Sequence, residues 1–226
     1  MRLICLGSGS AGNCYVLENG TEALVIEAGI SFKEVKKALN FNIRKIVGVV
    51  TSHGHMDHVG RVKEYENAGI PIFKPYESEV IRQVRTYGSF MIKSFNLVHD
   101  VPCCGFLVTH SEMGQLLYVS DTEYVKYRFE RLNHILVEAN YSAELLKQNY
   151  ERGLRNRVLQ THMELQTTLD FLRVNNNPGL QNVMLCHLSS DNADPEMFLG
   201  EVKKVVDCDA CIATRNVVVD VNLEPF

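Results

Sequence analysis

Three histidines and an aspartate fall within six consecutive positions of the stretch TSHGHMDHVG, residues 51–60. Imidazole rings repel one another once they are protonated, so this cluster needs a partner that holds neutral rings together. A divalent metal ion is such a partner, because neutral imidazole nitrogens and carboxylate oxygens are both common metal ligands. The alternative, a solvated loop, requires this order of residues to arise by chance. We therefore predict a metal site built on His53, His55, Asp57 and His58.

Further ligands are expected where other predicted strands end, because strand ends converge at one edge of a sheet. Three candidates end or follow apolar runs and a fourth lies in the loop-like QTHM; they are His99, Asp121, His187 and His162. The candidate ligand set is thus His53, His55, Asp57, His58, His99, Asp121 and His187, with His162 in reserve. His110 and His134 are interpreted as ordinary surface or core histidines.

This candidate set contains seven ligands, which is too many for one tetrahedral zinc ion. It suits two metal ions that lie close together and share one carboxylate. Imidazole and carboxylate ligands without cysteine favour Zn²⁺, Mn²⁺, Fe²⁺ or Ni²⁺ over copper–thiolate or iron–sulfur centres. We predict two divalent metal ions as cofactors, with Zn²⁺ as the first choice and Mn²⁺ or Ni²⁺ as alternatives.

Short apolar strands alternate with helix-like segments along the chain. Strands are predicted at residues 2–7, 14–19, 23–29, 45–52, 89–99, 104–110, 115–121, 134–140, 182–189, 211–214 and 217–221. Helices are predicted at 31–40, 61–69, 77–88, about 142–159, 164–174 and 195–206. Asn19-Gly20 is a hairpin signal between the second and third strands. This order predicts an α/β fold in which two mixed sheets pack together and helices cover the outer faces, as a single domain over residues 1–226.

Composition narrows the functional classes. A formal net charge of −4 gives no overall attraction for nucleic acid, although a local basic stripe remains compatible with it. The chain begins with an apolar run too short for a signal peptide, and no stretch has the length of a membrane span. The seven cysteines are predicted to be free thiols, which favours the cytoplasm, and Cys103, Cys104, Cys208 and Cys211 are expected to pack in the core.

Several sequence blocks resemble those of a known superfamily. HGHMDH matches the HxHxDH signature of the metallo-β-lactamase superfamily. LGSGSAGN, VIEAG, VHDVPCCGF, VSDTEY, LVEAN and LCHLSSDN resemble, in order, the blocks of its compact bacterial YycJ/WalJ-like hydrolases. The resemblance implies an αββα sandwich with a dinuclear site at one edge, without the helical insertion of the RNA-processing relatives.

The same resemblance implies a role for each candidate ligand. His53, His55 and His99 would bind the first metal, Asp57, His58 and His187 the second, and Asp121 would bridge the two. The loop from Gly7 to Asn13 would line the pocket. Two positions depart from the family pattern: Glu27 stands where Asp is usual, and His162 is followed by Met-Glu. Glu27, Thr51 and Glu138 are candidates to support the ligand imidazoles, with an ordinary strand-end carboxylate as the alternative for Glu138.

The predicted chemistry is hydrolysis. A water shared by two dications has its pKa lowered toward neutrality, Asp57 would orient it, and His162 would contact the substrate or protonate the leaving group. The resemblance implies a phosphodiesterase acting on nucleic acid, similar to a DNA exonuclease, and Lys93, Arg152, Arg155 and Arg157 are candidate backbone contacts. The alternatives are a hydrolase of a small substrate such as a cyclic nucleotide, and a non-catalytic binding module. The sequence does not decide whether the substrate is DNA or RNA, or whether the protein is a monomer or a homodimer.

Overall fold

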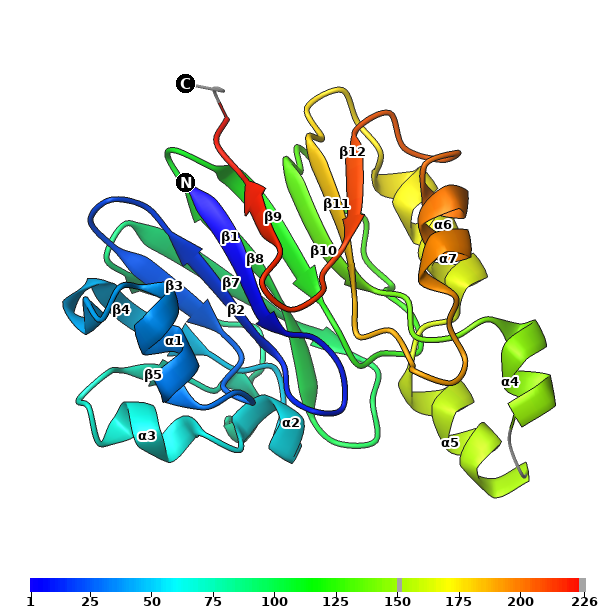
Figure 1. Ribbon diagram of the computed structural model, residues 1–226, viewed down its shortest axis with the longest axis horizontal. Helices are drawn as coiled ribbons and strands as arrows, with labels where there is room; N and C mark the ends of the chain where they lie inside the picture. The colour runs from blue at the N-terminus through cyan, green and yellow to red at the C-terminus, as the bar shows by residue number, and fades with distance from the viewer. Residues whose placement is uncertain (150–151, 224–226) are drawn as a thin grey trace.

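Two β-sheets lie face to face in the computed structural model, and helices cover their outer sides (Figure 1). The structure describes residues 1–149 and 152–223, with the backbone alone for residues 149 and 152–155. The predicted α/β architecture of two mixed sheets flanked by helices is confirmed.

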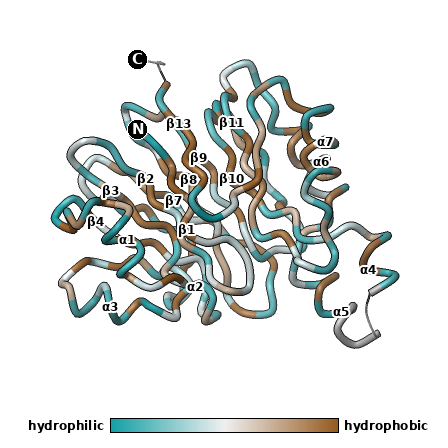
Figure 2. Tube along the Cα trace, viewed as in Figure 1, coloured by the Kyte–Doolittle hydropathy of each residue, from teal (hydrophilic) through white to brown (hydrophobic). Residues whose placement is uncertain are grey.

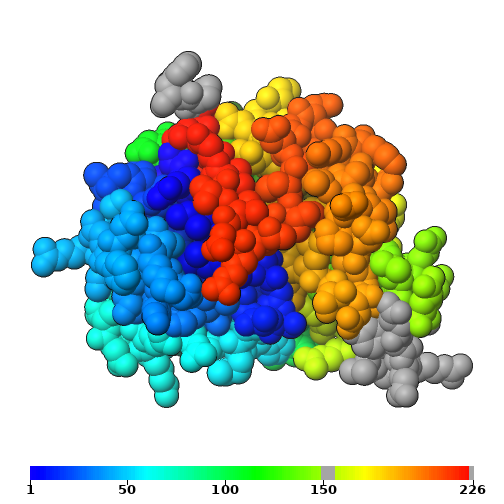
Figure 3. All heavy atoms as spheres, viewed as in Figure 1, coloured from blue at the N-terminus to red at the C-terminus, as the bar shows by residue number. Residues whose placement is uncertain are grey.

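The first sheet contains six strands in the order β13-β1-β2-β3-β4-β5. They are β1 (Arg2–Gly7), β2 (Cys14–Glu18), β3 (Ala23–Ile26), β4 (Ile46–Val50), β5 (Ile72–Phe73) and β13 (Val218–Asp220). The hairpin predicted at Asn19-Gly20 joins β2 to β3, and the Asn19 Oδ1 accepts hydrogen bonds from the Thr21 and Glu22 amides, both at 2.8 Å. The two ends of the chain meet in this sheet, where β13 pairs antiparallel with β1 beside it (Figure 3).

The second sheet contains seven strands in the order β12-β11-β10-β9-β8-β7-β6. They are β6 (Val84–Tyr87), β7 (Phe90–Leu97), β8 (Cys103–His110), β9 (Gly114–Val119), β10 (His134–Glu138), β11 (Asn182–Cys186) and β12 (Asp209–Ile212). Strands β6 to β9 form an antiparallel meander, whereas β9 to β12 run parallel. Because β9, β10 and β11 are parallel, their carboxyl ends reach the same edge of the sheet.

Helices return the chain between the parallel strands. They are α1 (Phe32–Ala38), α2 (Met56–Val59), α3 (Val62–Glu66), α4 (Ala143–Asn149), α5 (Arg152–Thr161), α6 (Leu165–Asn175) and α7 (Pro195–Val202), with 3-10 turns η1 (Ile43–Lys45) and η2 (Pro75–Glu77). The helix predicted at about 142–159 is thus described as α4 and α5. Among the described residues, every helix is too short or too polar to cross a bilayer.

Apolar side chains form three buried layers. One lies between the sheets and includes Leu17, Phe106 and Met184. A second lies between the first sheet and α1 and α3, and a third lies between the second sheet and α6 and α7. Figure 2 shows the strands as the main hydrophobic segments inside more hydrophilic connections. Because both faces of the central strands are buried, these strands read as continuous apolar runs and were recognisable in the sequence.

The helix predicted over residues 77–88 is wrong. The structure has the 3-10 turn η2 at its start and the edge strand β6 at its end. Strand β6 pairs antiparallel with β7, and Tyr87 packs against the layer between the sheets. Pairing with the edge of the sheet satisfies the backbone of this segment, so the tertiary environment overrides its helical pattern.

The cysteines agree with the sequence analysis in part. All seven are free, and Cys103 and Cys104 are fully buried in β8. Cys208 and Cys211 are only partly buried, and both pack at the margins of the apolar layers.

Candidate metal centre

The candidate ligands come together because their strands end at one edge of the sandwich. The segment containing His53 follows β4 directly, and α2 begins three residues later at Met56. Asp121 and His187 follow β9 and β11, and both have left-handed backbone conformations, with φ of 53° and 52°. This conformation costs a non-glycine residue of order 1–3 kcal/mol, and such strain is concentrated at functional sites.

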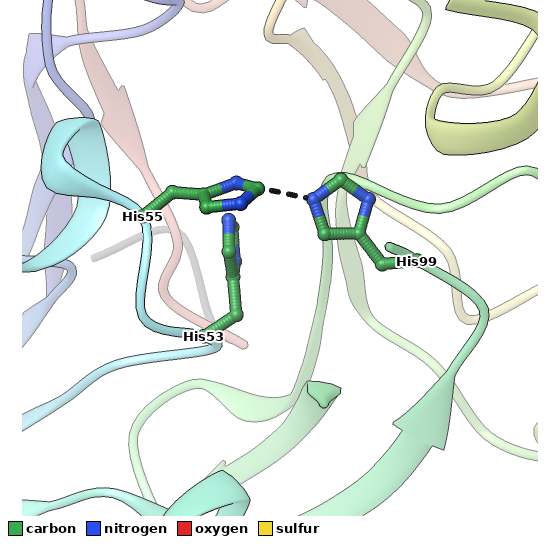
Figure 4. Close-up of side chains that lie close together, drawn as sticks. All are labelled: His53, His55 and His99. Carbon is green, nitrogen blue, oxygen red and sulfur yellow. Dashed lines mark hydrogen bonds between the residues drawn. The ribbon is translucent and has the colours of Figure 1, made fainter. Parts of the chain in front are cut away.

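One group of ligand atoms comes from His53, His55 and His99, which lie within 4.8 Å of one another. Figure 4 shows the three imidazoles converging on one point, with His55 Nδ1 and His99 Nε2 3.3 Å apart. The Nε2 of His53 is buried and has no hydrogen-bond partner. Burial lowers the pKa of His53 to about 2, so its ring stays in the neutral form that binds metals.

A second group comes from Asp57, His58 and His187, whose ligand atoms also lie within 4.8 Å of one another. His187 Nε2 is buried without a hydrogen-bond partner, although Asp57 Oδ2 lies 3.5 Å from it. Buried polar atoms are normally hydrogen-bonded, so each group contains one orphaned nitrogen that needs a partner. A divalent cation fits this need.

Asp121 lies between the two groups. Its Oδ2 is 3.0 Å from His58 Nε2, and it also forms a compact group with His53 and His58. Its Oδ1 is 3.7 Å from the Nδ1 of His187, which belongs to the second group together with His58. A carboxylate in this position can offer one oxygen to each of two cations.

Ser52 and Glu27 support the segment of residues 53–58 through contacts with His53 and His58. The Ser52 hydroxyl lies 2.9 Å from His53 Nδ1, and the Ser52 amide donates to Glu27 Oε1 at 3.1 Å. Glu27 Oε1 is also 3.3 Å from His58 Nδ1, so the longer side chain does reach the segment. The expectation for Thr51 is wrong, because its hydroxyl pairs with that of Tyr76 at 3.3 Å. Ser52, one residue later, takes the expected place.

Glu138 lies directly beside the candidate proton donor. Its Oε1 is 2.6 Å from His162 Nδ1 and 3.2 Å from His187 Nδ1, and the side chain is fully buried. Of the two readings of Glu138, the structure favours the supporting role over an ordinary strand-end carboxylate. With Nδ1 occupied, His162 Nε2 makes no hydrogen bond to any described residue.

Ionised carboxylates dominate the electrostatics of this edge. Burial opposes the charged form of Asp121, but His187 and His58 hold its pKa well below the usual value. Burial also opposes protonation of His187, but Asp121, Asp57 and Glu138 outweigh it and raise the pKa of His187 to about 10. A buried site that keeps its carboxylates ionised attracts positive charge.

The ligands open onto a pocket of about 300 Å³. It is lined by Ser10, His55, Asp57, His99, Asp121, Arg157, Val158, Thr161, His162 and His187. Ser10 belongs to the predicted 7–13 loop, and Asn13 of the same loop places its Nδ2 2.9 Å from His58 Nε2. A larger hollow of about 610 Å³ lies around Met1, Glu18 and Lys45, but no histidine lines it.

Of the three candidate arginines, only Arg157 has a described side chain, and it lines this pocket. Arg157 lies at its rim, where one guanidinium nitrogen is 3.6 Å from Asp100. Asp100 was not among the predicted site residues, but its Oδ1 lies 3.2 Å from His99 Nε2. The one sequence signal for it is its position directly after His99. The side chains of Arg152 and Arg155 lie outside the described part of the chain.

Comparisons with known proteins find similar sequences along most of the chain. Residues 7–79 match the family model of the metallo-beta-lactamase superfamily. The chain is 24% identical to Exodeoxyribonuclease YycJ of Bacillus anthracis, over 89% of this chain and 88% of that protein. It is 25% identical to Exodeoxyribonuclease WalJ of Streptococcus pneumoniae, over 85% of this chain and 83% of that protein.

Solved structures agree on the fold. The metallo-beta-lactamase fold protein YhfI from Bacillus subtilis superposes with a TM-score of 0.71 at 18% identity, covering 96% of this chain and 98% of that one. The chain therefore has the metallo-β-lactamase fold, and residues 7–79, which contain the HxHxDH segment, match the family model of that superfamily.

Proposed function

We propose that the protein is a metal-dependent phosphodiesterase that acts on nucleic acid, with a dinuclear site. The observation that carries this proposal is that two candidate ligand groups lie at one pocket, whose lining includes Asp121 and His162. The relatives named exodeoxyribonucleases, similar over more than four fifths of the chain, support nucleic acid as the substrate class.

The donor set assigns residues to two divalent ions. In this proposal His53, His55 and His99 hold one ion, Asp57, His58 and His187 hold the other, and Asp121 contributes to both. When bound, such ions supply a hydroxide nucleophile at neutral pH and offset the negative charge that develops on phosphate oxygens. Zn²⁺ suits the imidazole and carboxylate donors, and Mn²⁺ or Ni²⁺ are the alternatives.

Two side chains act on the substrate and the attacking water. Asp57 is only partly buried and lies at the pocket wall, where its Oδ2 can orient a water molecule. His162 presents the free Nε2 and can protonate the leaving oxygen. Burial alone would lower the pKa of His162, but the neighbouring Glu138 carboxylate outweighs burial, and the pKa is raised above its ordinary value. The ring is therefore protonated more often than that of an ordinary histidine. Protonation is what a proton donor needs.

One observation favours a second substrate class. The pocket volume of about 300 Å³ is at the lower end of the range for small-molecule sites. A cyclic mononucleotide is therefore the alternative substrate of the same chemistry.

The deciding experiment compares substrates side by side. Purified protein loaded with Zn²⁺ or Mn²⁺ is assayed on single-stranded DNA, double-stranded DNA, RNA and cyclic mononucleotides, with the Asp121→Ala variant as the blank. Faster hydrolysis of polymeric substrates supports the proposal. Hydrolysis of cyclic mononucleotides alone would replace it with the alternative, and no hydrolysis of any phosphodiester would refute both.

A further inference from the structure

Cations without carboxylate partners gather on one part of the second sheet. The segments 79–97 and 122–131 carry six cationic side chains against three carboxylates, although the whole chain has a net charge of −4. The six are Arg82, Arg85, Lys93, Lys126, Arg128 and Arg131, and none of them forms an ion pair with a described residue. Like charges repel one another, so an anionic partner would bind favourably to such a surface.

Three of these cations share one outer face. Lys93 on β7 lies opposite Val84 on β6, and directly paired residues project from the same side of a sheet. Phe95 projects from that side too, into the outer apolar layer, and its ring contacts that of Tyr127 at 5.6 Å. The Arg82 guanidinium lies 5.2 Å from the Tyr127 ring centre, and the Lys126 Nζ lies 5.5 Å from it. Arg82 and Lys126 therefore lie beside Tyr127, and Lys93 projects from the same side of β7 as Phe95, which contacts that ring. We call these three cations the cationic patch.

Both segments of the patch lead directly to the metal centre. Strand β7 continues into His99, and the segment with Lys126 begins after Asp121. From Lys93 to His99 an extended strand covers about 20 Å, at about 3.3 Å per residue. That span equals about six nucleotides of a stacked strand, at about 3.4 Å each.

An exposed aromatic side chain lies in the segment that joins Asp121 to Lys126. Tyr124 is 44% exposed and comes three residues after Asp121, and its carbonyl accepts a hydrogen bond from the Thr122 hydroxyl at 2.9 Å. Its ring stacks on no described aromatic side chain. On the segment with Arg82, Val80 and Val84 are 63% and 61% exposed, and Val84 pairs with Lys93, so the surface offers apolar area as well as charge.

We infer that this surface binds a single strand of nucleic acid that runs from the metal centre past Tyr124 to the cationic patch. Phosphates would contact Arg82, Lys93 and Lys126, and an unpaired base would stack on Tyr124. Aromatic rings beside a cationic groove are the usual means of holding single strands without sequence preference. A duplex keeps its bases stacked inside and cannot use Tyr124. The inference rests on the proposed function, because it names the strand whose cleavage that function requires.

Binding can be measured without hydrolysis. A fluorescein-labelled oligothymidylate is titrated with wild-type protein in excess EDTA, and affinity is read from anisotropy at several salt concentrations. The Lys93→Glu/Lys126→Glu variant is expected to bind at least tenfold more weakly. Its plot of log affinity against log salt should lose a slope of about 1.4, at about 0.7 per phosphate contact.

The matched control is Arg44→Glu/Lys63→Glu. It makes the same change of net charge with two exposed, unpaired cations near the first sheet. This control should keep affinity within twofold of the wild type, whereas Tyr124→Ala should lose about fivefold or more. Equal losses in both charge variants, an unchanged affinity in Tyr124→Ala, or equally tight binding of a duplex of the same length would overturn the inference.

Hydrolysis of bis(p-nitrophenyl) phosphate separates this inference from the proposed function. This substrate is too small to reach the patch, so all these variants should turn it over at the wild-type rate. If the wild type hydrolyses no phosphodiester while the binding differences remain, the proposed function fails and the surface stands. If this substrate is hydrolysed but binding is insensitive to the patch, the surface fails and the function stands.

Discussion

Six of the eight histidines of this chain meet at the sheet edge, and two lie in the interior of the fold. The interior pair are fully paired: His134 has Met113 O and Asn182 Nδ2 within 3.1 Å of its two nitrogens. His110 likewise has Glu22 Oε1 and the Glu112 amide at 3.1 Å. At the edge, His53 and His187 each keep a buried Nε2 without a hydrogen bond.

This contrast teaches how to distinguish a structural histidine from a candidate ligand. Both kinds are buried, so burial alone does not separate them. A structural imidazole uses both nitrogens within the protein, because an unpaired buried nitrogen costs about 1–3 kcal/mol. His53 and His187 each use one nitrogen for support and leave the other for a cation.

The largest expected effect concerns the carboxylate shared by the two groups. Asp121→Ala should abolish hydrolysis while leaving the fold largely intact, because Asp121 forms a compact group with His53 of the first group and His58 of the second. Turnover is measured on the best substrate, with circular dichroism as the check on folding. The control is Glu22→Ala, which removes the carboxylate partner of His110 and should leave turnover within about threefold. Near-normal turnover of Asp121→Ala would show that Asp121 is not the bridge.

The next effect separates two neighbouring edge histidines. His187→Ala should lose about one of two metal equivalents, because the second group drops below the ligands a dication needs. His162→Ala should keep both metals and lose turnover, by about 10²- to 10⁴-fold, since His162 is proposed as a proton donor. Metal content is measured by elemental analysis of protein purified without chelator. Loss of metal only in His162→Ala would exchange the two roles, and one equivalent under metal excess in the wild type would remove the dinuclear site.

The interior histidine His134 should make the protein sensitive to acid. Burial lowers the pKa of His134 to about 4, against about 6.5 in the unfolded chain, so the native state favours the neutral ring. The stabilisation is complete above about pH 6.5 and is lost as pH falls toward 4, by up to about 3 kcal/mol. Urea unfolding of metal-free wild type and His134→Asn measures this loss between pH 7 and 4. An identical pH dependence in the two proteins would contradict the assignment, and metal content should be equal in both at pH 7.

The smallest expected effect concerns the support of His53. Ser52→Ala removes the hydroxyl next to His53 Nδ1 and should weaken metal affinity by about tenfold, with little change in stability. Competition with a fluorescent chelator measures the affinity. Thr51→Val is the matched control, because the Thr51 hydroxyl faces Tyr76 instead. Equal affinities of the Ser52 and Thr51 variants would remove the distinction between them.

Much of the fold was readable from local pattern. The apolar runs of β4, β9 and β11 are continuous because helices or the partner sheet cover both faces, and each run ends just before a candidate ligand. The helix predicted at residues 77–88 is wrong, because strand β6 forms only by pairing with β7. The sequence of residues 77–88 contains no pattern that indicates this pairing.

The sequence by itself determined which residues are candidate metal ligands. The spacing of His53, His55, Asp57 and His58 is a property of one short segment after one strand, and interior histidines lack such spacing. The tertiary structure alone decided which side chain contacts the Nδ1 atom of each of these imidazoles. Glu138 reaches His162 across 24 residues and His187 across 49, and Ser52 rather than Thr51 faces His53. Hydrogen bonds require atoms within about 3 Å, and only the packing of distant strands sets distances on that scale.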